Sequence, residues 1–317
     1  MAAPHPQLHA LLDALGAHFD HRWLDSDPLR WPRTFADPDD REVVAVIAAL
    51  LAYGRVASIH RAIADVLARL GPRPAEALAP ARRARLDAAL DGFRHRFTAG
   101  PDVAWLLRGV AAARDTAGSL GAFVAAHATG PEPLRAGLAS WRRLADGTDP
   151  TTDPVRRRAR RFLLADPEGG AACKRSLLLA RWCVRPDDGL DLGLWTHGPL
   201  RPRDLLLPLD THVHRTVRDL GLTRRAVADW RCAAEVTARL AAFDPDDPVR
   251  YDFALARPGI AGGCRHRHVP AVCGGCALVA ACRHGAGPRR AATSGRRTRG
   301  LPRTTPARAP SCRTPDR

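Results

Sequence analysis

Residues 208–215 read Pro-Leu-Asp-Thr-His-Val-His-Arg, and this stretch has the composition of a helix start. Asp210 is well placed to cap that helix, because an aspartate oxygen accepts hydrogen bonds from the free backbone amides of a first turn. Val213 and Val217 recur on one side of the helix, which is expected to end at Gly221. A capping role alone is enough to explain an aspartate at position 210. If its carboxylate also faces a cleft, it can stabilise positive charge that develops on a sugar, or move a proton.

Outward from this stretch, apolar residues recur with helical spacing along most of the chain. Asp37 and Pro38 predict the start of a helix with a long apolar body, and Gly54 predicts its break. A second helix is expected at 56–70. Further helices are expected at 103–114, 118–127, 134–144, 155–164, 173–184, 211–220, 229–242 and 247–256. No segment alternates apolar and polar residues over five or more positions, so we predict an all-α protein with an ordered, loop-rich segment at 186–207 that contains a short helix.

The composition is that of a globular protein. The chain of 317 residues is long enough for a sizeable core and for one or two domains, and it is 45% hydrophobic and 26% charged. No apolar segment approaches the ~18 residues that a membrane helix needs, so we expect no membrane partner. The first eight residues carry neither a basic leader nor an apolar signal core, so we expect a cytoplasmic protein with reduced thiols.

The positive charge is unevenly distributed. Lys and Arg number 49 against 33 Asp and Glu, a formal net charge of +16, and residues 283–317 alone hold ten arginines and one acid. We predict that this tail is disordered and adds weak, salt-sensitive affinity for a polyanion. The Arg-rich runs at 82–85 and 156–161 are most simply interpreted as solvated helix faces. The charge of the remaining chain favours an anionic partner such as nucleic acid, although a solvated basic surface explains it equally well.

Lys174 is the only lysine among these 49 basic residues. A coding bias that replaces lysine wherever positive charge suffices cannot replace a nucleophilic primary amine, because a guanidinium group stays protonated. The lysine follows Gly169 and Gly170 in a segment that predicts a glycine turn opening a helix, where backbone amides can approach an anion. A neutral lysine there can attack an electrophilic carbon and form a Schiff base. The alternatives are chance retention and an ordinary surface lysine at a helix start.

Four cysteines follow within 19 residues, in the pattern C-x8-C-x2-C-x5-C. They are Cys264, Cys273, Cys276 and Cys282. Four thiols so close together in a cytoplasmic chain are typical of metal ligands rather than of disulfides. The pattern predicts a [4Fe–4S] cluster. A structural Zn²⁺ site is the alternative, because His266, His268 and His284 lie alongside.

Together these motifs resemble those of the helix-hairpin-helix (HhH-GPD) DNA glycosylase superfamily, which includes endonuclease III. Residues 209–215 look like the helix start that bears the catalytic aspartate, Lys174 stands where the bifunctional glycosylase/lyases carry their lysine, and the cysteines resemble the iron–sulfur loop of endonuclease III. Over roughly residues 36–282, the chain resembles more closely a bacterial domain-of-unknown-function family that is related to this superfamily. The segments that carry this likeness are 170–176, 181–185, 191–195, 208–212 and 230–237.

The resemblance implies a two-lobed glycosylase-like domain at 36–283, an N-terminal helical extension at 1–35 and the tail at 284–317. It implies a DNA base-excision repair glycosylase with AP lyase activity, acting as a monomer on damaged duplex DNA in the cytoplasm at the nucleoid. Lys174 is then the nucleophile and Asp210 the catalytic carboxylate. The residues implied to contact DNA are Tyr53, Arg55, Gly169, Gly170, Arg175 and His212.

Two other functions fit the same residues. One is a non-catalytic nucleic-acid-binding protein of the same fold, whose metal cluster is structural. The other is an enzyme that uses Lys174 as a Schiff base on a substrate other than nucleic acid. For His212 and His214, packing within the protein is a simpler interpretation than contact with a phosphate.

Overall fold

The structure is a computed structural model that describes residues 7–196, 198–260 and 263–285, and these are predominantly helical, as predicted. The α-helices are α1 (Leu8–His18), α2 (Pro38–Leu50), α3 (Val56–Leu70), α4 (Pro80–Arg83), α5 (Leu86–Ala89), α6 (Gly100–Ala117), α7 (Leu120–Ala126), α8 (Pro133–Thr148), α9 (Pro154–Leu163), α10 (Lys174–Val184), α11 (Thr211–Asp219), α12 (Trp230–Leu240), α13 (Asp252–Ile260) and α14 (Pro270–Cys273). The 3-10 helices are η1 (His21–Ser26), η2 (Pro28–Arg30), η3 (Pro32–Thr34), η4 (Glu76–Leu78) and η5 (Pro202–Asp204). None of the described helices is long and apolar enough to span a bilayer.

Helix α2 is buried along most of its length. Asp37 caps it by accepting hydrogen bonds from the amides of Asp39 and Asp40, and Pro38 occupies the first helical position, as predicted. Every side chain in the run 43–50 is buried. This is why the segment reads as continuously apolar rather than as a one-sided stripe. Helix α2 packs against α3, η3 and α10.

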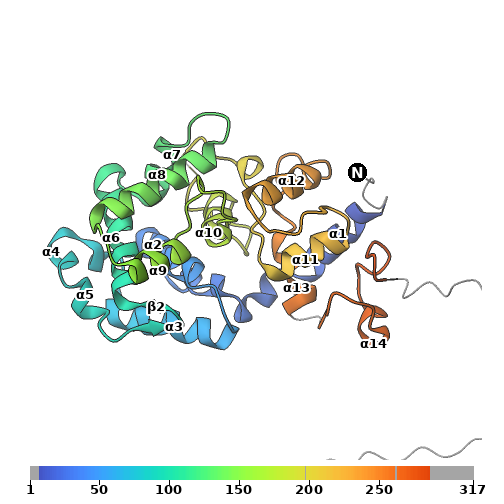
Figure 1. The fold of residues 1–317 in the computed structure, drawn as a ribbon, viewed down its shortest axis with the longest axis horizontal. Helices are drawn as coiled ribbons and strands as arrows, with labels where there is room; N and C mark the ends of the chain where they lie inside the picture. The colour runs from blue at the N-terminus through green and yellow to red at the C-terminus, as the bar shows by residue number, and fades with distance from the viewer. Residues whose placement is uncertain (1–6, 197, 261–262, 286–317) are drawn as a thin grey trace, which may run out of the picture. The chain divides into compact units, whose positions relative to one another are not determined.

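Helix α10 lies between two groups of helices (Figure 1). On one side α6 packs against α7, α8 and α9, and on the other α11 packs against α13, which also contacts α1. The described residues belong to one compact unit. The predicted disordered tail at 284–317 lies, beyond residue 285, outside the described residues.

A short hairpin was not predicted from the sequence. Strand β1 (Arg94–His95) pairs antiparallel with β2 (Thr98–Ala99). Arg96 in the turn has a φ of 56°, in the left-handed region, and Phe97 beside it is 48% exposed. Strands of two residues are too short to produce an alternating pattern, which is why the sequence does not reveal them.

Two other sequence interpretations need correction. The helix expected at 247–256 runs from Asp252 to Ile260 and includes Pro258, because the residues before it form a turn in which Asp244 accepts a hydrogen bond from the amide of Asp247. The run 156–161 is not solvated throughout. Arg160 is only 2% exposed, since it donates to Asp149 and its guanidinium carbon lies 5.2 Å from the centroid of the Trp105 ring. The segment 186–207 is a loop that contains η5, as predicted.

Candidate active site

Helix α10 begins at Lys174 with an open N-terminus. Cys173, immediately before it, is buried in the left-handed conformation with a φ of 46°, and its side chain caps no amide. Gly170 has a φ of 75° and turns the chain, and its carbonyl accepts a hydrogen bond from the Trp230 amide at 3.2 Å. First-turn amides have no acceptor within their own helix, so this end of α10 offers free donors and the positive end of its dipole.

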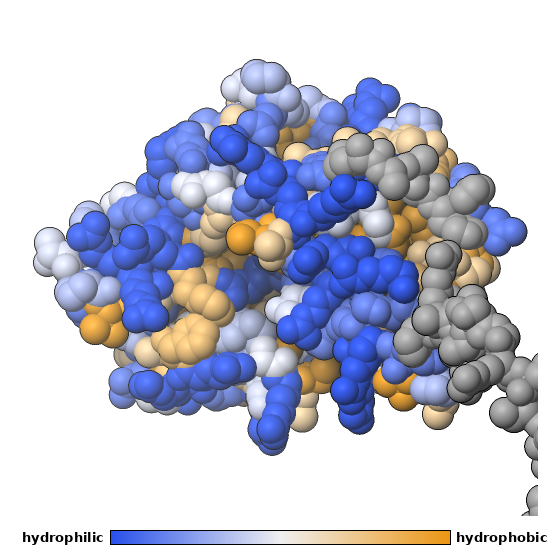
Figure 2. Space-filling model, turned by 45° about the vertical axis from the view of Figure 1, so that its right-hand side comes forward, coloured by the Kyte–Doolittle hydropathy of each residue, from blue (hydrophilic) through white to orange (hydrophobic). Residues whose placement is uncertain are grey.

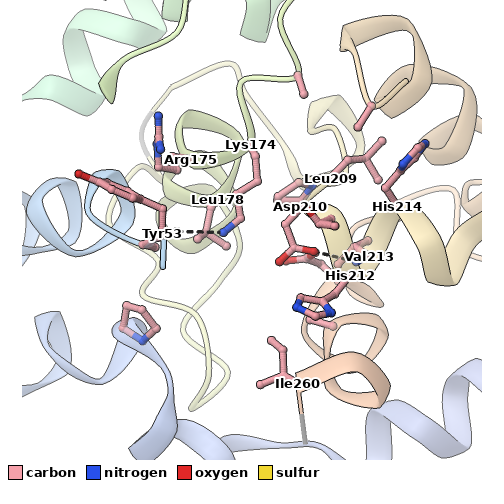
Figure 3. A pocket seen from close by; sticks show the side chains of 18 of the residues that line it. Tyr53, Lys174, Arg175, Leu178, Leu209, Asp210, His212, Val213, His214 and Ile260 are labelled. Atoms are coloured by element: carbon pink, nitrogen blue, oxygen red, sulfur yellow. Dashed lines mark hydrogen bonds between the residues drawn. The ribbon is translucent and has the colours of Figure 1, made fainter. Parts of the chain in front are cut away.

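The side chain of Lys174 extends toward the end of α2. Its Nζ donates a hydrogen bond to the Ala52 carbonyl oxygen at 3.4 Å, and the residue is half-buried. In Figure 3 the amine comes from the start of α10 and points into the same space as the Asp210 carboxylate opposite.

Helix α11, in contrast, has a closed start. The Asp210 carboxylate accepts a hydrogen bond from the Val213 amide at 2.7 Å, which confirms the predicted cap. Pro208 and Leu209, which lead into the cap, are buried, and they fix the position of the carboxylate. The cap uses one carboxylate oxygen, and Asp210 itself is half-buried at the edge of a cavity.

One cavity of about 1190 Å³ joins the two helix starts. Both Lys174 and Asp210 line it, although 36 positions separate them in the sequence. An amine and a carboxylate therefore face one space that is large enough for an extruded nucleotide or for a small substrate of another class.

An aromatic cluster borders the Lys174 side of this cavity. The Tyr53 ring stacks on Phe97 with centroids 5.5 Å apart, and its centroid lies 4.9 Å from that of Phe162. The Tyr53 hydroxyl donates to Thr98 Oγ1 at 2.6 Å, which fixes the ring within the cluster. Phe97, at the hairpin tip, is therefore the exposed member, and sequence reasoning missed it because a lone phenylalanine in a short loop carries no pattern.

Arg175, the second residue of α10, is held against the same rings. Its guanidinium carbon lies 4.1 Å from the centroid of Phe162 and 5.1 Å from that of Tyr53. Within the described chain it forms no ion pair with a carboxylate. Burial lowers the pKa of Arg175 to about 10, so it stays charged at neutral pH. An anion that enters the cavity meets a cation with no competing partner.

Further exposed arginines without a carboxylate partner in the described chain lie on the elements around the cavity. They are Arg55, Arg94, Arg96, Arg157, Arg158 and Arg161. Arg55 and Arg161 line the cavity itself, and the others stand on α9 and the hairpin. Hydrophilic side chains dominate the face seen in Figure 2. These observations are consistent with a surface for a polyanion.

The two histidines of α11 and the two glycines before α10 differ in their positions. His212 is exposed and lines the cavity on the Asp210 side (Figure 3). His214 is buried with its Nε2 3.1 Å from the Arg225 carbonyl oxygen, which agrees with the packing interpretation. Gly169 and Gly170 lie in the turn before α10 but are not among the residues that line the cavity.

Asp252 is a cavity residue that sequence reasoning missed. It is the first residue of α13, is 5% exposed, and lines the same cavity as Lys174 and Asp210. Its Oδ2 accepts a hydrogen bond from Arg181 at 2.8 Å. Nothing in the sequence around Asp252 distinguishes it from an ordinary acidic helix start.

The four cysteines of the predicted metal site line a second cavity, of about 340 Å³. Burial raises the pKa of the Cys282 thiol, and the neighbouring Asp219, Cys264 and Cys276 raise it further, so these groups lie near one another. The Val269 amide donates to the Cys273 sulfur at 3.4 Å. Thiols in one enclosed loop fit a cluster or Zn²⁺ in their chemistry, but among the described residues no three His, Cys, Asp or Glu side chains converge closely enough to hold an ion.

Asp219, at the end of α11, fixes this loop. Its carboxylate lies 2.8 Å from His266 Nδ1 and 2.7 Å from Arg283 Nη2. His266 Nε2 is buried and has no hydrogen-bond partner among the described residues, and His266 lines the cysteine cavity. A histidine oriented by a carboxylate is common at metal sites, so zinc held partly by His266 stays the alternative to the four-cysteine cluster.

Comparisons with known proteins identify a family but no activity. No curated protein matches the chain, and no solved structure matches it. The family model described as "Protein of unknown function (DUF2400)" matches residues 27–261. The match contains Lys174, Asp210 and Asp252 and ends before the four cysteines. Because it spans well over half of the sequence, the chain belongs to the DUF2400 family.

Proposed function

We propose that the protein is a DNA base-excision repair glycosylase with AP lyase activity. The observation that carries the proposal is that Lys174 and Asp210 face one cavity from two separate helix starts. The lysine is the only one in the chain, and the cavity is bordered by arginines that have no carboxylate partner within the described residues. Amine, carboxylate and polyanion-binding groups are the requirements of this chemistry.

In this proposal α9, the turn at 164–173 and α10 form the helix-hairpin-helix element of a two-lobed glycosylase fold. The open amides at the start of α10, together with Arg175, hold a DNA phosphate, because both donate to an anion without an internal competitor. Arginines of α9 and the hairpin hold further phosphates. The damaged nucleotide is extruded from the duplex into the cavity.

The chemistry then uses two residues. The lone pair of neutral Lys174 forms a bond to C1′ of the sugar while the C1′–base bond breaks, and its electrons leave with the base, which takes up a proton. Asp210 stabilises the positive charge that develops on the sugar. Loss of a proton from the new C–N group, with protonation of the ring oxygen, opens the sugar to an imine, and β-elimination then releases the 3′ phosphate.

We also propose that Cys264, Cys273, Cys276 and Cys282 hold a [4Fe–4S] cluster. The bound cluster supplies a covalent cross-link for the loop that Asp219 fixes to α11. Anaerobic purification with metal analysis and a visible spectrum tests this. About four irons per chain and a brown protein support the cluster. A colourless protein with one zinc, lost in a His266→Gln variant, supports the zinc alternative instead.

Borohydride trapping tests the proposed activity directly. The wild-type protein is incubated with duplexes that carry an abasic site or one of a panel of damaged bases, and base release is measured in parallel. A covalent adduct is expected, and mass spectrometry should locate it on the peptide that contains Lys174, the only lysine. Salt-dependent binding without adduct or base release from any duplex would instead identify a non-catalytic DNA-binding protein.

A further inference from the structure

Two arginines of α11 line the cavity that contains Lys174 and Asp210, and the proposed chemistry has not used them. They are Arg215 and Arg218, and they follow His212 at intervals of three residues along the helix. Side chains three positions apart are neighbours on a helix surface. All three line the cavity, so together they form one side of it, which we call the α11 wall.

Neither arginine of the α11 wall has a carboxylate partner in the part of the chain that the structure describes. Arg215 is exposed, whereas Arg218 is half-buried, and its Nε is enclosed by protein without a hydrogen-bond partner among the described residues. Of the two acids at the ends of α11, Asp210 caps the helix, and Asp219 is directed to the cysteine loop, where it lies 2.7 Å from Arg283. The positive charge of the wall is therefore available to a ligand.

The packing of α13 holds the α11 wall in place. A Cβ on Gly259 of α13 would lie 2.6 Å from His212 Nδ1, so the absence of a side chain allows the two helices to meet closely. Val213 and Val217 anchor α11 in the core. The enclosed stem of Arg218 has few alternative conformations, so this arginine loses little side-chain freedom when it binds a ligand.

The cavity carries excess positive charge on two opposite sides. Among the described residues that line it, seven arginines and Lys174 stand against three aspartates. Two of these, Asp27 and Asp252, are already paired with other arginines of the lining. Figure 3 shows Arg175 with Lys174 on one side of the space and the start of α11 on the other. A single anion bound beside Arg175 would leave the α11 wall without a counter-charge.

We propose that Arg215 and Arg218 bind a second DNA phosphate, on the opposite side of the extruded nucleotide from the phosphate held at the start of α10. This rests on the proposed function, in which one nucleotide leaves the duplex and enters the cavity. Such a nucleotide is joined to its strand by one phosphate on the 5′ side and one on the 3′ side. An arginine can bind each with two parallel N–H donors. Bound at both ends, the sugar is held between the Lys174 amine and the Asp210 carboxylate.

Neutral phosphate analogues test this assignment by binding alone. The duplex carries an abasic analogue that cannot be cleaved, with one methylphosphonate immediately 5′ or immediately 3′ of it, and affinity is measured by fluorescence anisotropy. Each methylphosphonate should weaken binding to the wild-type protein by about tenfold, because a charged hydrogen bond is lost. Arg215→Gln should bind the unmodified duplex about tenfold more weakly. In this variant the methylphosphonate on one side should cause no further loss, and the one on the other side should cause the full loss.

Two other variants of the same wall and of the opposite side extend the test. Arg218→Gln should lose its sensitivity on the same side of the analogue as Arg215→Gln. Arg175→Gln should lose it on the other side, because the proposed function places the first phosphate there. Arg224→Gln is the matched control, since Arg224 is exposed and has no carboxylate partner among the described residues but does not line the cavity. It should stay sensitive to both methylphosphonates.

The outcomes separate this proposal from the proposed activity. If Arg215→Gln binds like the wild-type protein, or stays sensitive to both methylphosphonates, Arg215 does not bind a flanking phosphate and the proposal is wrong. It is also wrong if Arg215→Gln loses affinity only for a free deoxynucleoside monophosphate, which would assign the wall to a mobile nucleotide. The expected pattern without any borohydride adduct would contradict the catalytic proposal alone. A wild-type protein that binds none of these duplexes would overturn both.

Discussion

The starts of α10 and α11 face the same cavity but differ in how their free amides are satisfied. Helix α11 carries its own anion, since Asp210 accepts the Val213 amide. Helix α10 has no such cap among the described residues, because Cys173 adopts the left-handed conformation and its side chain accepts no amide. A helix start that contains its own carboxylate satisfies amides within the chain, whereas the amides of an uncapped start stay available to water or to an anionic ligand. The amine of Lys174 thus stands at the helix start at which the proposed function places a DNA phosphate.

Replacing Lys174 should have the largest effect. Lys174→Gln and Lys174→Arg should both form no borohydride adduct, because neither side chain supplies a primary amine that can become neutral. Binding to the same duplex should weaken in the Gln variant and change little in the Arg variant, which keeps the charge. Adduct formation by either variant at the wild-type level would place the nucleophile at the N-terminal amine and remove Lys174 from the mechanism.

At the start of α11, the negative charge of Asp210 can be separated by mutation from its capping role. Asp210→Asn should keep the cap, since asparagine caps as well as aspartate, and should lower base release by about 100-fold or more because the negative charge is lost. Asp210→Ala should lose the same activity and also about 1 kcal/mol of folding stability, measured by urea unfolding. Equal base release by Asp210→Asn and the wild-type protein would leave the aspartate with a structural role only.

The two starts also show what the sequence alone can predict. The cap at Asp210 and the glycine turn before Lys174 are local features, and both could be read from neighbouring residues. The approach of Lys174 to Asp210 depends on how α10 and α11 pack, which the sequence does not state; the resemblance alone suggested it. Asp252 was missed because its place in the cavity comes from burial beside Arg181, a residue 71 positions away. Phe97 was missed because a two-residue strand leaves no pattern.

Removing the exposed aromatic ring of Phe97, beside the start of α10, should have a smaller effect on DNA binding. Phe97→Ala should weaken binding to damaged duplex by about tenfold, because stacking a base on an aromatic ring contributes about 1–3 kcal/mol. Tyr53 and Phe162 keep their own contact in this variant, since their rings meet directly. The folding stability should change little, because Phe97 is 48% exposed. An unchanged affinity, measured by fluorescence anisotropy, would separate the hairpin from the DNA-binding surface.

Replacing single arginines outside the cavity should have the smallest effect on DNA binding. The comparison tests whether an arginine without a carboxylate partner contributes more to DNA affinity than one that is paired. Arg157 on α9 is exposed and forms no ion pair in the described structure, whereas Arg69 donates to Asp65 at 2.7 Å. Arg157→Gln and Arg69→Gln remove the same charge, so a general effect of net charge would weaken DNA binding equally in both. If Arg157 contacts a phosphate, only its variant should reduce the slope of log affinity against log salt, by about one. Equal slopes in the two variants would mean that the basic surface attracts DNA only from a distance and that α9 does not touch the backbone.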